Sequence, residues 1–337
     1  MNLPPVLARL TGRLGRIVLN RPRAINALNG EMVALMREAL DRWENAPGVR
    51  AILITGAGER GLCAGGDIRA VHADAVSGGT ASLDFWAAEY RLNARIASYP
   101  KPIVAWMNGL VMGGGIGIGG HAGVRLVSER SRLAMPEVGI GLHPDVGGSR
   151  LLAAAPGLTG LHLALTGGSI GAGDAIYAGL ADHYMPTARF PELAAALTDG
   201  RVPAFGTPPP PGELAQARGW IDECYAAEEV DEILDRLRAH PDPAARAAAK
   251  EIEGKSPTSL AVTLRSVRSA AALPSLEAAL DQEFRLSSAL LHTHDLAEGI
   301  RAQIIDKDRD PRWSPPMADP AFVASCFAPR DRELGLA

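Results

Sequence analysis

The stretch GLVMGGGIGIGGHAG, residues 109–123, places eight glycines in fifteen positions and decides much of what this chain can fold into. Glycine inside a helix costs roughly 1 kcal/mol relative to alanine, so this many glycines must bring a compensating gain. The surrounding residues 102–124 carry no Asp, Glu, Lys or Arg and approach the length of a membrane span. The glycines, together with Asn108 and His121, favour a buried segment of a globular protein instead.

Short apolar segments alternate with amphipathic ones through the first half of the chain. Residues 30–43 repeat apolar side chains at helical spacing, with Asn29 at the N-cap position, and a second helix is predicted over 83–97. Strands are predicted at 16–20, 51–55, 102–107 and 124–128. This order is typical of an α/β fold with a parallel sheet.

The composition changes after Arg201. Residues 202–212, VPAFGTPPPPG, form a stiff connector that is poor in hydrogen-bond donors. Residues 213–305 then show helical patterns with breaks near Pro241, Pro257 and Pro274. We therefore predict an α/β core over residues 1–201 and a helical C-terminal region over 213–337.

The bulk composition points to a small-molecule partner. The 34 basic and 38 acidic residues give a net charge of -4, which predicts neither nucleic-acid nor membrane binding. The three cysteines form no Cys-x-x-Cys pair, which argues against a disulfide framework or a zinc site and fits a reducing, cytoplasmic location. HTHD, residues 292–295, lacks a third metal ligand, so we expect it on the surface and predict no metal.

A dinucleotide-binding interpretation is weak. Gly115, Gly117 and Gly120 satisfy Gly-x-Gly-x-x-Gly after a predicted strand. The acid about 20 residues farther on, however, is Glu137, which follows Pro136 in a loop instead of ending a strand.

A serine nucleophile is also disfavoured. GGSIG, residues 167–171, matches the nucleophile elbow of α/β-hydrolases at Ser169. The elbow requires a preceding strand, whereas LTGLHLALTG is typical of a helix that ends at glycine. We predict a turn between two helices at Ser169.

Backbone chemistry explains the glycines better. Glycine lets peptide N–H groups approach a ligand oxygen closely, and two such groups aimed at one oxygen form an oxyanion hole. A second glycine-rich turn, GLCAGGDIRA at residues 61–70, follows a predicted strand and could supply the other donor. The alternative is that both turns only permit close packing.

Two carboxylates could act on a carbonyl group held by such donors. MPEVGIGLHPDVGG, residues 135–148, presents Glu137 after Pro136 and Asp145 after Pro144. A carboxylate can attack an acyl carbon or take a proton from water. Two alternatives stay open: Asp145 caps a helix that begins at Val146, and Glu137 is a solvated turn residue.

These motifs resemble the enoyl-CoA hydratase/isomerase (crotonase) superfamily, and the resemblance covers nearly the whole chain. The family stretches are IVLNRPRAINALN, ITGAGERGLCAGGDI, KPIVAWMNGLVMGGGIGI and MPEVGIGLHPDVGGSRLL. Two further stretches, KSPTSLAVTLR and EFRLSSALLHTHDLAEGIRAQIIDKDRDPRW, most resemble the branch of 3-hydroxyisobutyryl-CoA hydrolases.

The resemblance implies an α/β, crotonase-like spiral of ββα units, followed by C-terminal helices that mediate association or cover an acyl-CoA site. By motif match, the N–H groups of Gly66 and Gly114 would bind the thioester oxygen. The superfamily often forms trimers and pairs of trimers, but the hydrolase branch need not, so the resemblance leaves a homo-oligomer open.

The same resemblance assigns residues to coenzyme A. The backbone around Ala64, Asp67 and Ile68 would hold the adenine, and Arg23 is a weaker candidate for the phosphates. CoA is part of the substrate, and the resemblance implies no metal or redox cofactor.

One departure from the family pattern bears on the reaction. Hydratases carry one catalytic glutamate shortly after the triple glycine, where this chain has Gly117, and a second at the position of Glu137. Asp145 stands where hydratases usually have glycine and the hydrolases have aspartate. The resemblance thus implies hydrolysis of 3-hydroxyisobutyryl-CoA or 3-hydroxypropionyl-CoA by Glu137 and Asp145. An enoyl-CoA hydratase or isomerase and a non-catalytic acyl-CoA-binding protein are the alternatives.

Overall fold

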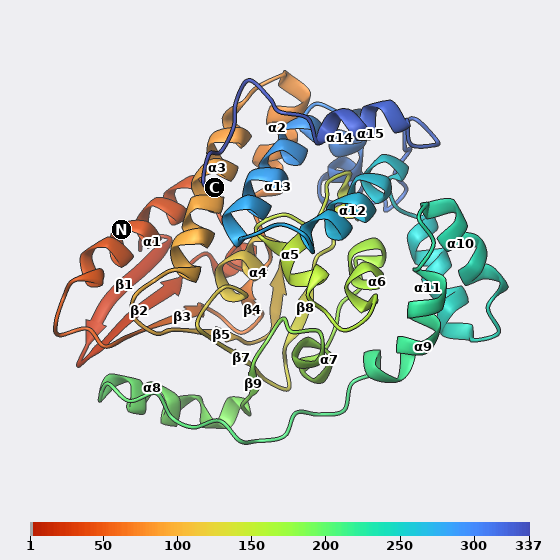
Figure 1. Cartoon of the computed structure of the whole chain (residues 1–337). Helices are drawn as coiled ribbons and strands as arrows, with labels where there is room; N and C mark the ends of the chain where they lie inside the picture. The colour runs from red at the N-terminus through yellow and green to blue at the C-terminus, as the bar shows by residue number, and fades with distance from the viewer. Residues whose placement is uncertain (1–2) are drawn as a thin grey trace. The chain divides into compact units, whose positions relative to one another are not determined.

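A six-stranded sheet contains the four predicted strands, which run parallel as expected. The computed structural model describes residues 3–337. The parallel strands are β2 (Leu14–Leu19), β3 (Ala51–Gly56), β5 (Ile103–Met107) and β7 (Val124–Val127), side by side in this order (Figure 1). At the edges, β1 (Val6–Thr11) pairs antiparallel with β2, and β9 (His183–Tyr184) pairs parallel with β7. β3 and β5 are almost entirely buried, which explains their continuous apolar runs.

A second, three-stranded parallel sheet was not predicted. It consists of β4 (Gly61–Cys63), β6 (Leu110–Met112) and β8 (Arg132–Ala134), and segments this short show no readable alternation. The glycine-rich turns begin where β4 and β6 end. Because β4 and β6 are parallel neighbours, both turns emerge at the same edge of this sheet.

Two compact units share the chain, and neither is one continuous segment. The first contains the residues up to Gly66 together with Ala88–Ala134 and Ile170–Gly212, and the second contains Asp67–Ala87, Met135–Ser169 and Glu213–Ala337. The division by sequence into residues 1–201 and 213–337 stays a prediction.

Two helices of the first unit agree with the sequence expectations. The Asn29 side chain accepts a hydrogen bond from the Met32 N–H (2.9 Å) at the start of α1 (Gly30–Glu44). The helix predicted over 83–97 is α3 (Ala81–Ala97), whose later residues belong to this unit. The others are the 3₁₀ turns η1 (Pro22–Ala24) and η3 (Thr187–Arg189), and the helices α4 (Gly114–Gly119), α7 (Ala172–Tyr177) and α8 (Phe190–Thr198).

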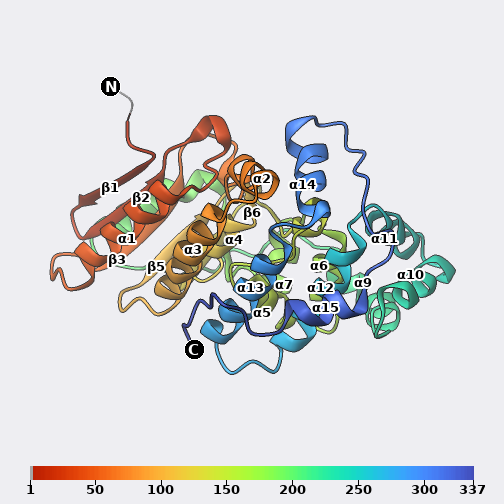
Figure 2. The ribbon, with the colours of Figure 1, turned by 90° about the horizontal axis from the view of Figure 1, so that it is seen from above.

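The second unit is helical. Its elements are α2 (Ile68–Ser77), η2 (Glu137–Ile140), α5 (Gly148–Ala153), α6 (Thr159–Thr166), α9 (Leu214–Cys224), α10 (Val230–Ala239), α11 (Pro243–Glu253), α12 (Pro257–Ala270), α13 (Leu276–Leu290), α14 (His294–Ile300), the π-helical turn η4 (Arg301–Ile305) and α15 (Pro320–Cys326). The breaks fall near Pro241, Pro257 and Pro274, as predicted. Figure 2 shows α10 and α11 side by side.

Candidate active site

The two glycine-rich turns of the first unit lie against each other. A Cβ atom added to Gly65 would lie 3.8 Å from the Gly114 nitrogen, and one added to Gly114 would lie 3.5 Å from the Gly65 carbonyl carbon. Gly65 has φ +103° and Gly113 has φ +46°, a backbone conformation that glycine adopts without a steric cost. The glycines therefore permit both the turns and their close approach.

Hydrogen bonds to the neighbouring carbonyls fix the direction of the two predicted amides. The Gly65 carbonyl accepts from the Leu28 N–H (2.8 Å), and the Gly113 carbonyl accepts from Ile116 (2.7 Å) inside α4. In a trans peptide the N–H points opposite to the C=O. The Gly66 N–H consequently points away from Leu28, and the Gly114 N–H points out of the first turn of α4. Both directions suit donors to an external oxygen.

Two buried side chains lie next to these turns. The Cys63 Sγ donates to the Gly65 carbonyl (3.4 Å), and burial raises the pKa of this thiol to about 12, so it stays protonated. Glu89 of α3 is 2% exposed, and a Cβ on Gly114 would overlap its carboxyl oxygen. Glu89 was not among the residues predicted from the sequence. Its only signal was an acid on the face of α3 that also carries Trp86 and Tyr90.

The residues assigned to CoA are accessible to different degrees. Ala64 is half-buried, and its N–H donates to the Ile25 carbonyl (3.0 Å). Asp67 and Ile68 are half-buried at the start of α2. Arg23 is exposed in η1, where its carbonyl accepts from Arg60 (2.7 Å).

Glu137 lies in the second unit and is buried, which contradicts the alternative of a solvated turn residue. It begins η2 and is 6% exposed. The carbonyl of the next residue, Val138, accepts from the Ser256 N–H (3.3 Å). A Cβ on Gly299 would lie 2.5 Å from the carbonyl carbon of Ile140. The segment that carries Glu137 is therefore packed closely against α14 and the start of α12.

Asp145 is also buried in the second unit, at 6% exposure. The alternative that it caps a helix beginning at Val146 is wrong, because α5 begins at Gly148 and its N-cap is Gly147. Val146 has φ +55° and Gly147 has φ +80°, so two consecutive residues directly after Asp145 have left-handed backbone conformations. A β-branched residue at positive φ is a rare outlier.

Side chains of α13 hold this turn. The Glu283 carboxyl group is fully buried and accepts from the N–H groups of Gly147 (2.6 Å) and Ser149 (3.0 Å) and from the Ser149 hydroxyl (2.5 Å). Burial, with the charge of Asp145 as a smaller contribution, raises the pKa of Glu283 to about 8. Sequence reasoning missed Glu283, although an acid within the apolar stripe of a helix was a readable signal.

His143 adds a second connection to α13. Burial lowers the pKa of its imidazole to about 4, so the ring is neutral near pH 7. Its Nδ1 lies 3.0 Å from the Pro144 carbonyl and its Nε2 lies 3.1 Å from the Ser287 hydroxyl. A carbonyl only accepts, so Nδ1 carries the proton and Nε2 accepts from Ser287.

The competing motifs have structural roles. Ser169 is exposed in the turn between α6 and α7, as predicted, and Gly167 ends α6 with φ +64°. Gly115 and Gly117 lie inside α4, not in a turn before it, which disagrees with a dinucleotide fingerprint. A Cβ on Gly115 would lie 2.6 Å from the Cys63 carbonyl oxygen, so close packing accounts for this glycine.

The surface prediction for residues 292–295 is partly wrong. His292 and His294 are exposed, but Asp295 is 2% exposed. Its carboxylate accepts from the Ser256 hydroxyl (2.5 Å) and the Ser314 N–H (2.7 Å). Within residues 3–337, no cluster of three His, Cys, Asp or Glu side chains is arranged to hold a metal ion.

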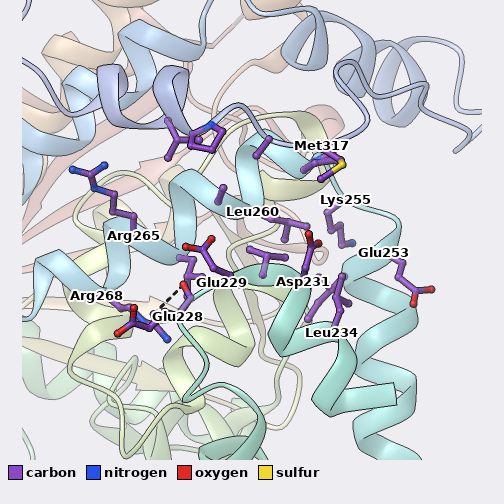
Figure 3. A pocket seen from close by; sticks show the side chains of 18 of the residues that line it. Glu228, Glu229, Asp231, Leu234, Glu253, Lys255, Leu260, Arg265, Arg268 and Met317 are labelled. Carbon is purple, nitrogen blue, oxygen red and sulfur yellow. Dashed lines mark hydrogen bonds between the residues drawn. The ribbon is translucent and has the colours of Figure 1, made fainter. Parts of the chain in front are cut away.

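A cavity of about 1010 Å³ opens between the C-terminal helices of the second unit. Figure 3 shows Arg268 beside Glu228, whose carbonyl it contacts (3.3 Å), and Lys255 near Met317 and Glu253. Its acids and bases are mixed, so it presents no single sign of charge. Among residues 3–337, none of the predicted catalytic or CoA-binding residues lines this cavity.

None of the helices in the described part of the chain is both long and apolar enough to cross a bilayer. Cys63, Cys224 and Cys326 are free thiols, and all three are buried.

Known proteins match this chain over nearly its whole length. The model of the family described as enoyl-CoA hydratase/isomerase matches residues 14–327. The mitochondrial 3-hydroxyisobutyryl-CoA hydrolase of Danio rerio is 37% identical over 350 residues, which cover 98% of this chain and 91% of that protein.

Two solved structures share the fold and much of the sequence. A carnitinyl-CoA dehydratase from Mycobacterium thermoresistibile is 50% identical with a TM-score of 0.95, and the match covers 99% of both chains. An enoyl-CoA hydratase from Rhodobacter sphaeroides is 45% identical with a TM-score of 0.93, covering 96% of this chain and 97% of the other. The architecture is therefore that of these two CoA enzymes, which are named for different activities.

Proposed function

Because this chain belongs to the enoyl-CoA hydratase/isomerase family, we propose that it is an acyl-CoA thioester hydrolase whose substrate is 3-hydroxyisobutyryl-CoA. The proposal rests on the relatives named as 3-hydroxyisobutyryl-CoA hydrolases and on the residues of the candidate site. It assigns the enzyme to valine breakdown, with 3-hydroxypropionyl-CoA as a second substrate.

The observation that carries the proposal is the pair of buried carboxyl groups in one segment, Glu137 and Asp145. A hydratase needs a second glutamate after the triple glycine, where this chain has a buried Gly117 inside α4. This chain therefore lacks one of the two glutamates with which hydratases add water across a double bond. Cleaving a thioester needs one oxygen nucleophile or base, which the proposal assigns to Glu137, and a stabilised oxyanion, which it assigns to the N–H groups of Gly66 and Gly114.

The roles follow from the chemistry of each group. The Gly66 and Gly114 N–H groups stabilise the negative charge that develops on the thioester oxygen. Glu137 either attacks the carbonyl carbon or activates water. In the first route the C–S bond breaks, CoA leaves as a thiolate that takes a proton, and water hydrolyses the mixed anhydride. Asp145 orients the substrate hydroxyl or assists proton transfer.

The remaining predictions are proposals that this function supports. The backbone around Ala64, Asp67 and Ile68 holds the adenine, and Arg23 contacts the phosphates. CoA enters as part of the substrate, and no other cofactor is assigned. The free thiols support a cytoplasmic location, although the Danio rerio relative is named as mitochondrial.

The assay that tests the proposal compares two substrates. The protein is incubated with 3-hydroxyisobutyryl-CoA and, separately, with crotonyl-CoA, while free thiol and the absorbance of the enoyl group are followed. We expect thiol release from the first substrate only. Loss of enoyl absorbance without thiol release would show a hydratase instead. Binding of CoA esters without any turnover, unchanged in Glu137→Gln and Asp145→Asn, would support a non-catalytic binding protein.

A hydratase or dehydratase is the second candidate, because the two solved structures carry these names. The names describe the elimination of water, for the dehydratase, and the addition of water, for the hydratase. This candidate predicts that crotonyl-CoA or a carnitinyl-CoA is converted faster than any thioester is cleaved.

The two routes for Glu137 are separated by isotope transfer. In a single turnover in ¹⁸O-labelled water, the label enters the Glu137 carboxyl group only if an anhydride forms and water attacks it at the Glu137 carbonyl carbon. Water activation, or attack on the anhydride at the acyl carbon, places the label in the released acid alone. Label in the peptide that contains Glu137, detected by mass spectrometry, therefore demonstrates the anhydride route.

A further inference from the structure

The turn after Asp145 keeps a conformation that its own residues disfavour. Val146, at φ +55°, is a β-branched residue in the left-handed region, and it is 1% exposed. Backbone strain of this kind persists only where the surrounding structure imposes it, and it concentrates at functional sites. Contacts from elsewhere in the second unit must therefore impose the turn.

Glu283 supplies these contacts from a distant part of the chain. One of its carboxyl oxygens accepts the Gly147 N–H (2.6 Å), and the other accepts both the N–H (3.0 Å) and the hydroxyl (2.5 Å) of Ser149. The two N–H groups flank the start of α5, directly after the left-handed turn. Only a group with two accepting oxygens at this spacing satisfies both.

Burial makes the arrangement rigid. Glu283 has no exposed surface, and α13 packs against α5 through this contact. Next to it on the same face, Ser287 binds the imidazole of His143, two residues before Asp145. The segment is thus tied to α13 on both sides of Asp145.

We propose that Glu283 is a positioning residue for Asp145: it holds the turn at Val146 and Gly147 and thereby fixes where the Asp145 carboxylate points. The inference rests on the role proposed above for Asp145 and adds a residue that acts through it. Glu283 touches backbone N–H groups and the Ser149 hydroxyl, so it contributes to the chemistry through Asp145.

Glu283→Gln tests this role, because an amide has one accepting oxygen. Gln can accept from Gly147 or from Ser149, and its NH₂ group then faces the other N–H donor to donor. Both oxygens of a carboxyl group can accept an N–H whether or not the group is protonated, because a hydroxyl oxygen keeps its lone pairs. Misplacing a catalytic group by about 1 Å can cost 10²-fold in rate. With 3-hydroxyisobutyryl-CoA we expect kcat to fall about 10- to 100-fold with KM changed less than about threefold.

Asp281→Asn is a matched control on the same helix. The Asp281 carboxylate also accepts from two backbone N–H groups, those of Leu336 (2.9 Å) and Ala337 (3.0 Å), but it holds the C-terminal tail instead of the Asp145 turn. Asp281→Asn should lower the thermal midpoint and leave kcat unchanged. Equal kcat values for the two variants would overturn the positioning role.

The double variant Glu283→Gln/Asp145→Asn separates positioning from general stability. If Glu283 acts through Asp145, the double variant should be no slower than Asp145→Asn alone. Losses that multiply would contradict the proposal. If Glu283→Gln does not fold, Glu283→Asp replaces it, because Asp keeps two accepting oxygens on a shorter side chain. Its kcat should lie between those of wild type and Asp145→Asn. A kcat equal to that of wild type would count against the proposal.

Failure of the proposed function would look different. A wild-type protein that releases no thiol, or an Asp145→Asn variant as fast as wild type, would remove the role of Asp145 itself. Loss of activity in Asp145→Asn but not in Glu283→Gln would overturn the positioning role alone.

Discussion

Two regions of this molecule bend the backbone into the left-handed conformation next to a proposed catalytic group, and they do so with opposite chemistry. In the first unit, Gly65 (φ +103°) precedes Gly66 and Gly113 (φ +46°) precedes Gly114, so the turns cost little and the functional groups are peptide amides. In the second unit, Val146 (φ +55°) follows Asp145, and the functional group is a side chain.

The difference shows where the stabilising contacts must come from. A glycine turn needs no outside support, because the missing Cβ removes the steric cost locally. A valine turn needs acceptors from another part of the fold, and Glu283 supplies them from more than 130 residues away in sequence. The first kind of site is encoded locally, whereas the second depends on the packing of α13.

The largest expected effect comes from removing a carboxylate side chain of the second unit. Glu137→Gln keeps the size of the side chain but removes the nucleophilic or basic oxygen, and we expect kcat for thioester hydrolysis to fall about 10²- to 10⁴-fold. Thiol release measures the loss, and binding of the CoA ester should persist. A variant within threefold of wild type would remove Glu137 from the chemistry.

The backbone half is tested by Gly114→Ala. The added methyl group would overlap the Glu89 carboxyl group and lie 3.1 Å from Leu28 Cδ1, so either the buried Glu89 side chain or the Gly114 backbone must move. Loss of one oxyanion-hole donor costs about 10²- to 10³-fold in kcat, and we expect a loss near the lower value. Unchanged turnover would mean that this glycine serves packing alone.

The pH dependence of stability tests the environment of Glu283, which holds the turn after Asp145. The pKa of Glu283 is raised to about 8 by burial, so the folded protein binds a proton that the unfolded chain has released. This stabilisation is complete below the ordinary carboxyl pKa and is lost as the pH rises through about 8.

The thermal midpoint of the wild type should therefore fall by several degrees relative to Glu283→Gln between about pH 5 and about pH 8. Thermal unfolding of both proteins at matched pH checks this, since the other titrating groups are common to both. A constant difference would show that Glu283 keeps an ordinary pKa.

The smallest effect concerns a glycine outside the turns. Gly219 lies inside α9, and a Cβ there would meet no atom within 4 Å. Gly219→Ala should raise the free energy of unfolding by up to about 1 kcal/mol, with kcat unchanged. Denaturant unfolding measures the gain, and the variant serves as the control for Gly114→Ala. A loss of activity here would mean that glycine substitution disturbs the fold in general.

Much of the fold could be predicted because its signals are local. The strand at 51–55 and the helix capped by Asn29 are recognisable from periodicity and one capping side chain, and both agree with the structure. The three-stranded sheet could not be predicted, because β4, β6 and β8 have three residues each and are defined by their partners. The buried Asp295 was mistaken for a surface residue for the same reason, since its partners Ser256 and Ser314 are distant in sequence.

By itself, the sequence determined the four parallel strands of the large sheet, the helix capped by Asn29, the glycine-rich turns and the residue types of the proposed site, because each depends on neighbours along the chain. Only the tertiary structure decided that Gly65 lies against Gly114, that Glu137 and Asp145 are buried, and that Glu283 holds the turn after Asp145. The reason is physical. Burial and the partners of a buried carboxyl group depend on which helices pack together, and no local pattern specifies that.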